Sequence, residues 1–546
     1  METFFTILIL LLTVSLSGVV TRILPFQIPL PLMQIIVGAV LAWPQFGLHI
    51  DFNPELFLML FIPPLLFADG WKTPAQEFIH YGREILCLAL VLVIITVVGV
   101  GYLIHFLLPS IPLAAAFALA AVLSPTDAVA LSGIVGKGRM PKPVMSVIEG
   151  EALMNDASGL VSLNFSIAVA LGAMAFTLES AFLTFLQVSI GGVLCGIIIV
   201  FLYNQMVKFI HKWMYNDSAT QIIFSLLLPF SCYLIAERIG VSGILAAVSA
   251  GMMIGQSKVN RSMPLVRLRT NNIWEMLEFV FNGMVFILLG LQLPGILNFT
   301  VAQTGIDHSI SLETLLAYVV IIYFSLIAVR LIWLWLMKVG SATLMRKDPL
   351  LFSKFSTRDL FVAAFAGVRG AVTLAGVLSI PLFLLDGSPF PGRYQLVFIA
   401  SGVILLSIVV GIVTLPFLLR GNLPPEEDQE EAFSVSEALA SAATKAVNET
   451  KEKLLVAPPD DATPELIEET TRRMLDVLQR KILTKEDVKN IVALKRLEKQ
   501  LYLASLHAER EELYRLRRMK KISHEKQRKL LHRIDITEVL IAEDSV

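Results

Sequence analysis

Long apolar stretches recur along the first 420 residues of the chain and then stop. Stretches of about 17 to 25 apolar residues are long enough to cross a hydrocarbon core of about 30 Å as α-helices. The pattern predicts an all-α polytopic membrane protein with thirteen spans. Their approximate ranges are 3–24, 28–43, 54–71, 84–109, 112–136, 146–174, 184–207, 219–237, 241–256, 272–293, 314–337, 359–382 and 395–419.

Basic residues give this topology an orientation, because short cytoplasmic loops accumulate Lys and Arg. The loops after odd-numbered spans hold seventeen basic residues, whereas the loops after even-numbered spans hold only Arg238 and Arg393. We therefore expect the N-terminus outside and the C-terminus in the cytoplasm. The membrane is expected to be the plasma membrane, which in a bacterium is the inner membrane.

Composition supports the same class and divides the chain in two. Hydrophobic residues make up 55% of the chain and charged residues 16%, which excludes an ordinary soluble globular protein. The segment 421–429, rich in Pro and acidic residues, predicts a boundary between a transmembrane domain, 1–420, and a helical cytoplasmic tail, 421–546, with a regulatory role. The basic run 515–533 is either a solvated helix face or a contact with anionic lipid. Its interleaved acids imply no nucleic-acid partner.

Several charged residues fall inside the predicted spans, where they are costly and therefore candidates for function. Asp156 follows Asn155 about ten residues into the sixth span, or roughly 15 Å deep at helical rise. Glu151 lies one turn earlier, and the twelfth span carries Arg369. Asp69 lies near the cytoplasmic end of the third span, where it either attracts cations into a funnel or is simply solvated.

Two spans contain predicted breaks. In the fifth, Pro125 lacks a backbone donor and disfavours helix at the residue before it, so Thr126 and Asp127 are expected to line an interruption. In the twelfth, two glycines flank Arg369 in the segment 367–373. These spans run in opposite directions, which is the expected mark of inverted repeats with a binding site between them. Asp127 and Arg369 could neutralise the half-helix ends.

Asp156 supplies the candidate chemistry. A dehydrated site disfavours a bare carboxylate, so this side chain could hold either a proton or a cation. Na⁺ prefers hard oxygen ligands, which Asp156, Asn155, Thr126 and Asp127 could provide with water; Asp156 and Thr126 are the principal Na⁺ ligands expected. Competition on one carboxylate is sufficient to couple Na⁺ and H⁺ fluxes without a cofactor. Asp156 as half of a structural ion pair is the alternative.

A buried Glu needs a partner, and we expect Glu151 to pair with Arg369 as a structural clamp. Arg330, in the eleventh span, is expected to extend to the inner membrane surface instead.

These motifs resemble the monovalent cation:proton antiporter-1 family. The matching segments are 61–70 (FIPPLLFADG), 124–130 (SPTDAVA), 149–156 (EGEALMND), 242–246 (SGILA) and 367–370 (GVRG). The resemblance implies a homodimer in which each chain has an interface domain and a six-helix core domain with elevator-like alternating access. It also implies that Asp156 carries the ion, that Glu151 pairs with Arg369, and that the Asn155–Asp156 pair goes with electroneutral exchange. Ala152 departs from members that carry a hydroxyl ligand there.

Two other classes compete with an antiporter of Na⁺, or of Li⁺ or K⁺, for H⁺. A cation channel would also bury acidic residues, but nothing in the sequence indicates a filter ring. An ion-sensing receptor would signal through the tail, which carries no recognisable catalytic motif. The sequence contains no Gly-rich phosphate loop, so we expect a secondary transporter and not an enzyme.

Overall fold

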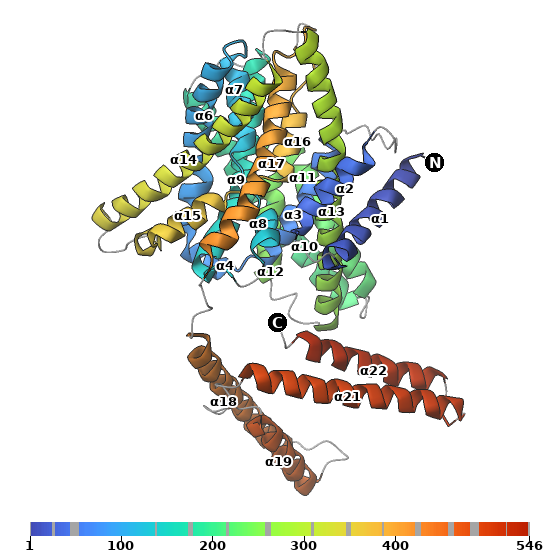
Figure 1. Cartoon of the computed structure of the whole chain (residues 1–546). Coiled ribbons are helices and arrows are strands. Elements are labelled where there is room, and N and C mark those ends of the chain that lie inside the picture. Colours follow the sequence, from blue (N-terminus) through green and yellow to red (C-terminus); the bar gives the residue numbers. More distant parts are fainter. Residues whose placement is uncertain are drawn as a thin grey trace. The chain divides into compact units, whose positions relative to one another are not determined.

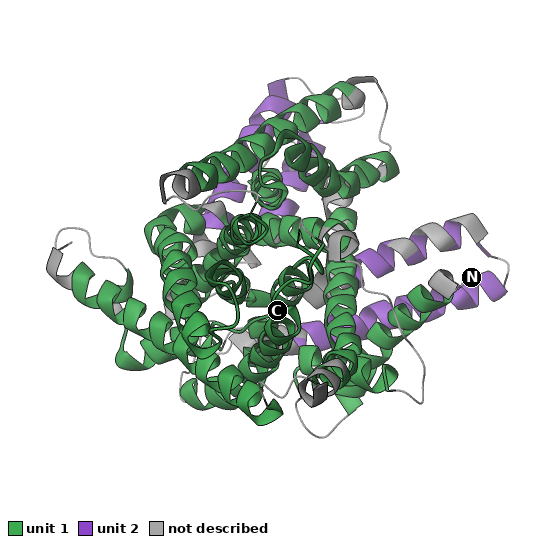
Figure 2. Ribbon diagram, turned by 90° about the horizontal axis from the view of Figure 1, so that it is seen from above, with its two compact units in different colours: residues 1–422 green, residues 423–546 purple. Residues whose placement is uncertain are grey.

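The computed structural model divides the chain into two compact units, Met1–Asn422 and Leu423–Val546 (Figure 2). Each unit is described by itself. The residues described are 2–23, 28–43, 54–136, 139–172, 178–213, 218–256, 264–306, 311–344, 351–384, 387–420, 427–456, 463–480, 491–519, 521–522 and 524–543.

The regular secondary structure in the described part of the first unit is helical, apart from one isolated bridge between Phe383 and Pro389 (Figure 1). Its first helices are α1 (Glu2–Ile23), α2 (Leu30–Leu41), α3 (Pro54–Lys72), α4 (Ala75–His80), α5 (Gly82–Leu86), the π-helical η1 (Cys87–Leu92), α6 (Val93–Leu107), α7 (Leu113–Leu123) and α8 (Ala128–Val135). They are followed by α9 (Lys142–Ala170), α10 (Leu178–Trp213), α11 (Ser218–Ile239), α12 (Gly243–Gln256), α13 (Pro264–Ile306), α14 (Leu312–Leu344), the 3₁₀ turn η3 (Leu351–Lys354), α15 (Thr357–Phe365), α16 (Ala371–Leu378) and α17 (Arg393–Leu418).

Helices occupy every one of the thirteen predicted segments, although their ends differ from the predicted limits. By length and composition alone, seven of the described helices could cross a membrane, or eight if the bent pair α7 and α8 forms one span. Two apolar helices, α2 and α12, are short. The structure thus establishes an all-helical membrane protein with seven to eight candidate spans.

The helices of the first unit pack in two groups. In the first group, α3 packs along α12, which also contacts α10 and α11, while α2 packs along α13. A small core within this group includes Phe67 of α3 and Trp274 of α13, whose rings lie 5.1 Å apart. In the second group, α7 packs between α6 and α9, and α17 contacts α14, α15 and α16. The groups meet where α13 contacts α17 and where α3 contacts α16.

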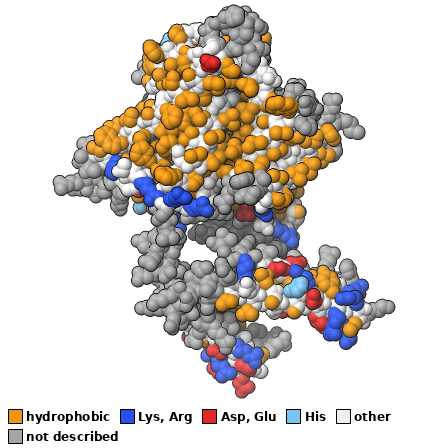
Figure 3. All heavy atoms as spheres, viewed as in Figure 1, with side chains coloured by type: hydrophobic (Ala, Val, Ile, Leu, Met, Phe, Trp, Pro, Cys, Tyr) orange, Lys and Arg blue, Asp and Glu red, His pale blue; other side chains and the backbone are white. Residues whose placement is uncertain are grey.

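The outer surface of this unit is apolar, as a lipid-facing surface requires. On α10, for example, Phe201, Leu202 and Phe209 are all exposed. Figure 3 shows hydrophobic side chains covering the visible face of the first unit, with Lys and Arg gathered along one edge.

The second unit consists of helices in its described part, in keeping with the helical periodicity of the tail. Helix α18 (Glu427–Val456) packs against α19 (Pro464–Arg480), and α21 (Ile491–Arg518) packs against α22 (His524–Glu543). Arg510 of α21 ties the second pair together by ion pairs with Asp535 and Glu538. Within α21, Arg515 donates two hydrogen bonds to Glu512, which lowers the pKa of that carboxyl.

Candidate functional site between two interrupted helices

The predicted break in the fifth span is confirmed: α7 ends at Leu123, α8 begins at Ala128, and the two helices differ in direction by 44°. Pro125 lies in the gap, where its missing N–H costs no helical hydrogen bond. Asp127 is the N-cap of α8, because its carboxylate accepts hydrogen bonds from the backbone N–H groups of Val129 and Ala130 at 2.8 and 2.9 Å.

The second break is also present, between the end of α15 at Phe365 and the start of α16 at Ala371. The two non-helical segments touch, since the backbone N–H of Asp127 donates to the Val368 carbonyl at 2.7 Å. Gly370 lies so close to Asp127 that an added Cβ would overlap its carboxylate. Glycine at position 370 leaves room for this carboxylate. The Asp127 carboxylate therefore lies at the amino ends of both α8 and α16.

Arg369 contacts backbone carbonyls at the carboxyl ends of α7 and α15. Its side chain is buried and donates from Nε to the Leu123 carbonyl, the last of α7, at 3.2 Å, and from Nη1 to the Gly367 carbonyl just beyond α15. Helix amino ends carry partial positive charge and carboxyl ends partial negative charge. Asp127 and Arg369 thus lie at the half-helix ends that the sequence expects them to neutralise.

Helix α9 packs against the first break and brings the Asn155–Asp156 pair to it. Asn155 is buried and donates from Nδ2 to the Thr126 hydroxyl at 2.8 Å, while its Oδ1 accepts from the Thr126 backbone N–H at 3.4 Å. One turn later an added Cβ at Gly159 would overlap the Pro125 ring, so glycine permits this close approach. Asn155 therefore fixes Thr126 in place relative to the neighbouring Asp156.

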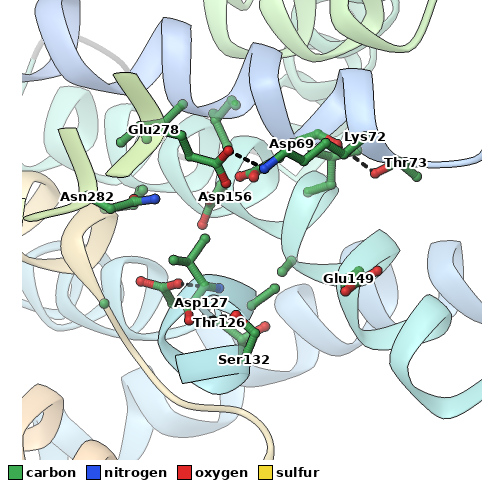
Figure 4. Close-up of a pocket in the computed structure, with 18 of the residues that line it drawn as sticks. Asp69, Lys72, Thr73, Thr126, Asp127, Ser132, Glu149, Asp156, Glu278 and Asn282 are labelled. Atoms are coloured by element: carbon green, nitrogen blue, oxygen red, sulfur yellow. Dashed lines mark hydrogen bonds and ion pairs between the residues drawn. The ribbon is translucent and has the colours of Figure 1, made fainter. Parts of the chain in front are cut away.

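A cavity of about 690 Å³ opens beside this junction (Figure 4). It lies between α3 and α13 of the first helix group and α8, α9 and α16 of the second. Thr126 and Asp156 are buried, and exposure increases through Asp127 and Asp69, which are half-buried, to the exposed Glu149. The cavity leads from an open, acidic end to a buried carboxylate.

The structure brings together most of the predicted site residues. Asp156, Thr126, Asp127 and Asp69 all line this cavity, with Thr373 of α16 among their neighbours. Asn155 does not line the cavity; its amide is engaged with Thr126 behind the cavity wall. Within the described residues no group of three or more His, Cys, Asp or Glu is arranged to hold a metal ion.

The predicted pair of Glu151 with Arg369 is wrong, and so is the surface position predicted for Arg330. Arg330 is buried and forms a bidentate ion pair with Glu151, with Nη2 and Oε2 2.6 Å apart. Helix α14 continues to Leu344, which leaves Arg330 about 20 Å from the helix end at 1.5 Å per residue. Arg369 makes no ion pair with any described residue, because its side-chain bonds go to carbonyls.

The sequence reasoning missed two features of the site. Lys72 of α3 forms an ion pair with Glu278 of α13 at the open end of the cavity. Glu275 also lines the cavity, and the three-residue spacing of Glu275 and Glu278 could have indicated a common helix face.

The second missed feature is the π-helical turn η1, which interrupts the helix formed by α5 and α6. Such turns leave carbonyls in need of other donors and are frequent at functional sites. Here the hydroxyl of Ser158, on α9, donates to the Ala89 carbonyl at 2.6 Å. The bond joins η1 to α9 about half a turn beyond Asp156. No sequence signal that we used distinguishes a π turn from an ordinary helix.

Two interrupted helices that meet beside a buried carboxylate, within a helical membrane unit, define an ion transporter of the broken-helix class. The family model described as "Sodium/hydrogen exchanger, transmembrane" matches residues 7–421. The chain belongs to this family, which confirms the resemblance seen in the sequence. It is a cation/proton antiporter and a transporter, not an enzyme.

Relatives of known name agree with this placement. The chain is 55% identical over 548 residues, covering all of both chains, to the "Uncharacterized Na(+)/H(+) exchanger YjcE" of Escherichia coli. It is 38% identical to a "Sodium, potassium, lithium and rubidium/H(+) antiporter" of Bacillus pumilus, over 99% of this chain and 78% of that protein. The fold is similar to that of the sodium proton antiporter MjNhaP1 from Methanocaldococcus jannaschii, with a TM-score of 0.55 and 17% identity over 77% of this chain and 99% of that one.

Proposed function

We propose that this antiporter exchanges Na⁺ for H⁺ at Asp156 and that it also accepts other alkali cations. The single observation that carries the proposal is the position of Asp156, a buried carboxylate facing a cavity whose other end is open and acidic. The Bacillus pumilus relative is named for sodium, potassium, lithium and rubidium. Li⁺ and K⁺ are therefore the first alternatives to Na⁺.

Coupling follows from competition. Asp156 binds a proton or a cation, and each excludes the other because both neutralise the same carboxylate. Thr126 supplies oxygen ligands from its hydroxyl or carbonyl, and its position depends on the hydrogen bonds from and to Asn155. Asp127 and Asp69 attract the cation electrostatically without replacing Asp156. One cation exchanges for one proton, so the cycle moves no net charge.

Access alternates when the two helix groups move relative to each other. The cavity lies at their junction, with Asp156 on the second group and Asp69 on the first, so relative movement exposes Asp156 on one side or the other. The proposed topology has thirteen spans in inverted repeats, with the N-terminus outside and the C-terminus in the cytoplasm of a bacterial inner membrane. The open end of the cavity then faces the cytoplasm, which makes this an inward-facing state.

The proposed assembly is a homodimer in the lipid bilayer. The exchange function belongs to residues 1–420 and a regulatory function to the tail, residues 421–546. If the tail regulates transport, a chain that ends at Arg420 will show a shifted pH profile of exchange.

Purified protein in sealed proteoliposomes tests the function directly. A preset pH gradient is followed with a pH-sensitive dye while NaCl, LiCl, KCl, RbCl or choline chloride is added outside. Dissipation of the gradient by Na⁺ and not by choline supports the proposal, and the series of salts gives the cation preference. Cation flux without proton movement would favour the channel alternative.

A further inference from the structure

Lys72 is the only basic residue among the described residues that line the cavity. The lining also includes six acidic residues, namely Asp69, Asp127, Glu149, Asp156, Glu275 and Glu278. Lys72 lies at the last position of α3, one turn after Asp69, and its ammonium pairs with Glu278 on α13. In Figure 4 the same ammonium also lies beside Asp69.

The pair is held within one helix group. Helices α3 and α13 contact each other, whereas Asp156 is carried by α9 of the second group. The Lys72 side chain is 51% exposed and that of Glu278 is 15% exposed, so the ammonium remains in contact with water. It is therefore a partly exposed charge on a flexible side chain and not a buried structural cation.

Lys72 and Asp156 line the same cavity, so a cation that enters it experiences the charge of the ammonium as well as that of the carboxylates. Acidic side chains that would attract the cation are already partly neutralised by Lys72. Two like charges about 4 Å apart in a water-like medium repel enough to change a binding constant about fivefold. Lys72 thus opposes the attraction that the acidic lining provides.

We propose that Lys72 is a tethered counter-cation that competes with the transported cation and sets the apparent KM of the exchanger. The proposal rests on the proposed function of the cavity. Lys72 does not coordinate the transported ion, because an ammonium offers donors and no acceptor. Its influence is through charge, and therefore extends in a similar ratio to Na⁺, Li⁺ and K⁺.

The test compares wild-type protein with Lys72→Met, Lys72→Gln and Lys72→Arg in proteoliposomes, measuring initial exchange rates against cation concentration. Lys208→Met is the matched control, since it removes one exposed Lys from α10 outside the cavity lining. We expect Lys72→Met and Lys72→Gln each to lower the apparent KM for Na⁺ about fivefold. Lys72→Arg, which keeps the charge, and Lys208→Met are expected to keep the wild-type KM.

The comparison of ions separates charge from coordination. A similar fall in KM for Na⁺, Li⁺ and K⁺ supports the proposal, whereas a change confined to one ion overturns it. An unchanged or raised KM in both neutral variants, with normal exchange by the wild type and the Lys208 control, also overturns it. Wild-type protein that moves no protons in response to any cation would reject the proposed function itself, and this inference with it.

Discussion

Glu151 of α9 and Arg330 of α14 form a bidentate ion pair, and their side chains are 1% and 4% exposed. Arg330 also donates from Nε to the Ala363 carbonyl of α15 at 2.8 Å. The pair thus joins three helices behind the cavity, within the group that carries Asp156. A buried pair of this kind contributes little net stability, but loss of one partner leaves an uncompensated charge.

The first prediction concerns this pair. Glu151→Gln or Arg330→Met should each destabilise the protein by about 3 to 5 kcal/mol, because each leaves one buried partner unpaired. The double variant should recover much of that loss. Thermal unfolding in detergent, followed by tryptophan fluorescence, measures the effect. Recovery of Glu151→Gln by Arg369→Met instead would contradict the observed pairing.

The contact between the two interrupted helices leads to the second prediction. Gly370→Ala should abolish exchange, because the added methyl group would overlap the Asp127 carboxylate and force the two breaks apart. Gly295→Ala is the control, since an added Cβ there meets nothing within 4 Å on an exposed part of α13. Normal cation/proton exchange by the Gly370 variant in proteoliposomes would show that transport does not require this close contact between the two breaks.

Ser158 gives the third prediction. Ser158→Ala removes the donor to the Ala89 carbonyl of η1 and should cost about 1 to 3 kcal/mol of stability, the usual effect of a buried acceptor left unpaired. Ser162→Ala is matched to it, since that hydroxyl bonds only within its own helix, to the Ser158 carbonyl. Hydrogen exchange should accelerate in the segment 87–92 only in the Ser158 variant. Equal rates of amide hydrogen exchange for this segment in the two variants would show that η1 does not depend on the Ser158 hydroxyl.

Electroneutral exchange is the fourth prediction. Moving one elementary charge through a potential of 100 mV is worth about 2.3 kcal/mol, so an electrogenic cycle responds strongly to voltage. The initial rate of Na⁺-driven proton movement should be the same with an imposed potential of either sign. A rate that rises with one polarity and falls with the other would show that each transport cycle moves net charge across the membrane, which would contradict electroneutral exchange.

Much of this site could be predicted from the sequence because its elements are local. Pro125 ends a helix through its own chemistry, and a motif such as 124–130 places Thr126 and Asp127 in one break. The expected depth of Asp156 in its span rests on helical rise alone and stays a prediction. Partner choice could not be predicted in this way. Arg369 and Arg330 were both available to Glu151, and the choice depends on how α14 packs behind α9 and on which carbonyls the breaks leave open.

The same limit explains the other omissions. Lys72 and Glu278 lie far apart in the sequence, and only the packing of α3 against α13 brings them to one cavity. The number of candidate spans depends on how apolar each helix is, so a helix rich in functional groups, such as α9, gives a weak hydropathy signal.

The most direct test of the central claim compares Asp156→Asn with wild-type protein in proteoliposomes, by cation-driven proton movement and by ²²Na⁺ uptake. Glu313→Gln, which removes an exposed acid of α14 outside the cavity lining, is the control. We predict that Asp156→Asn loses both fluxes while the control keeps both, because one carboxylate carries both ions. Coupled Na⁺ and proton movement by a correctly inserted Asp156→Asn protein would contradict the account.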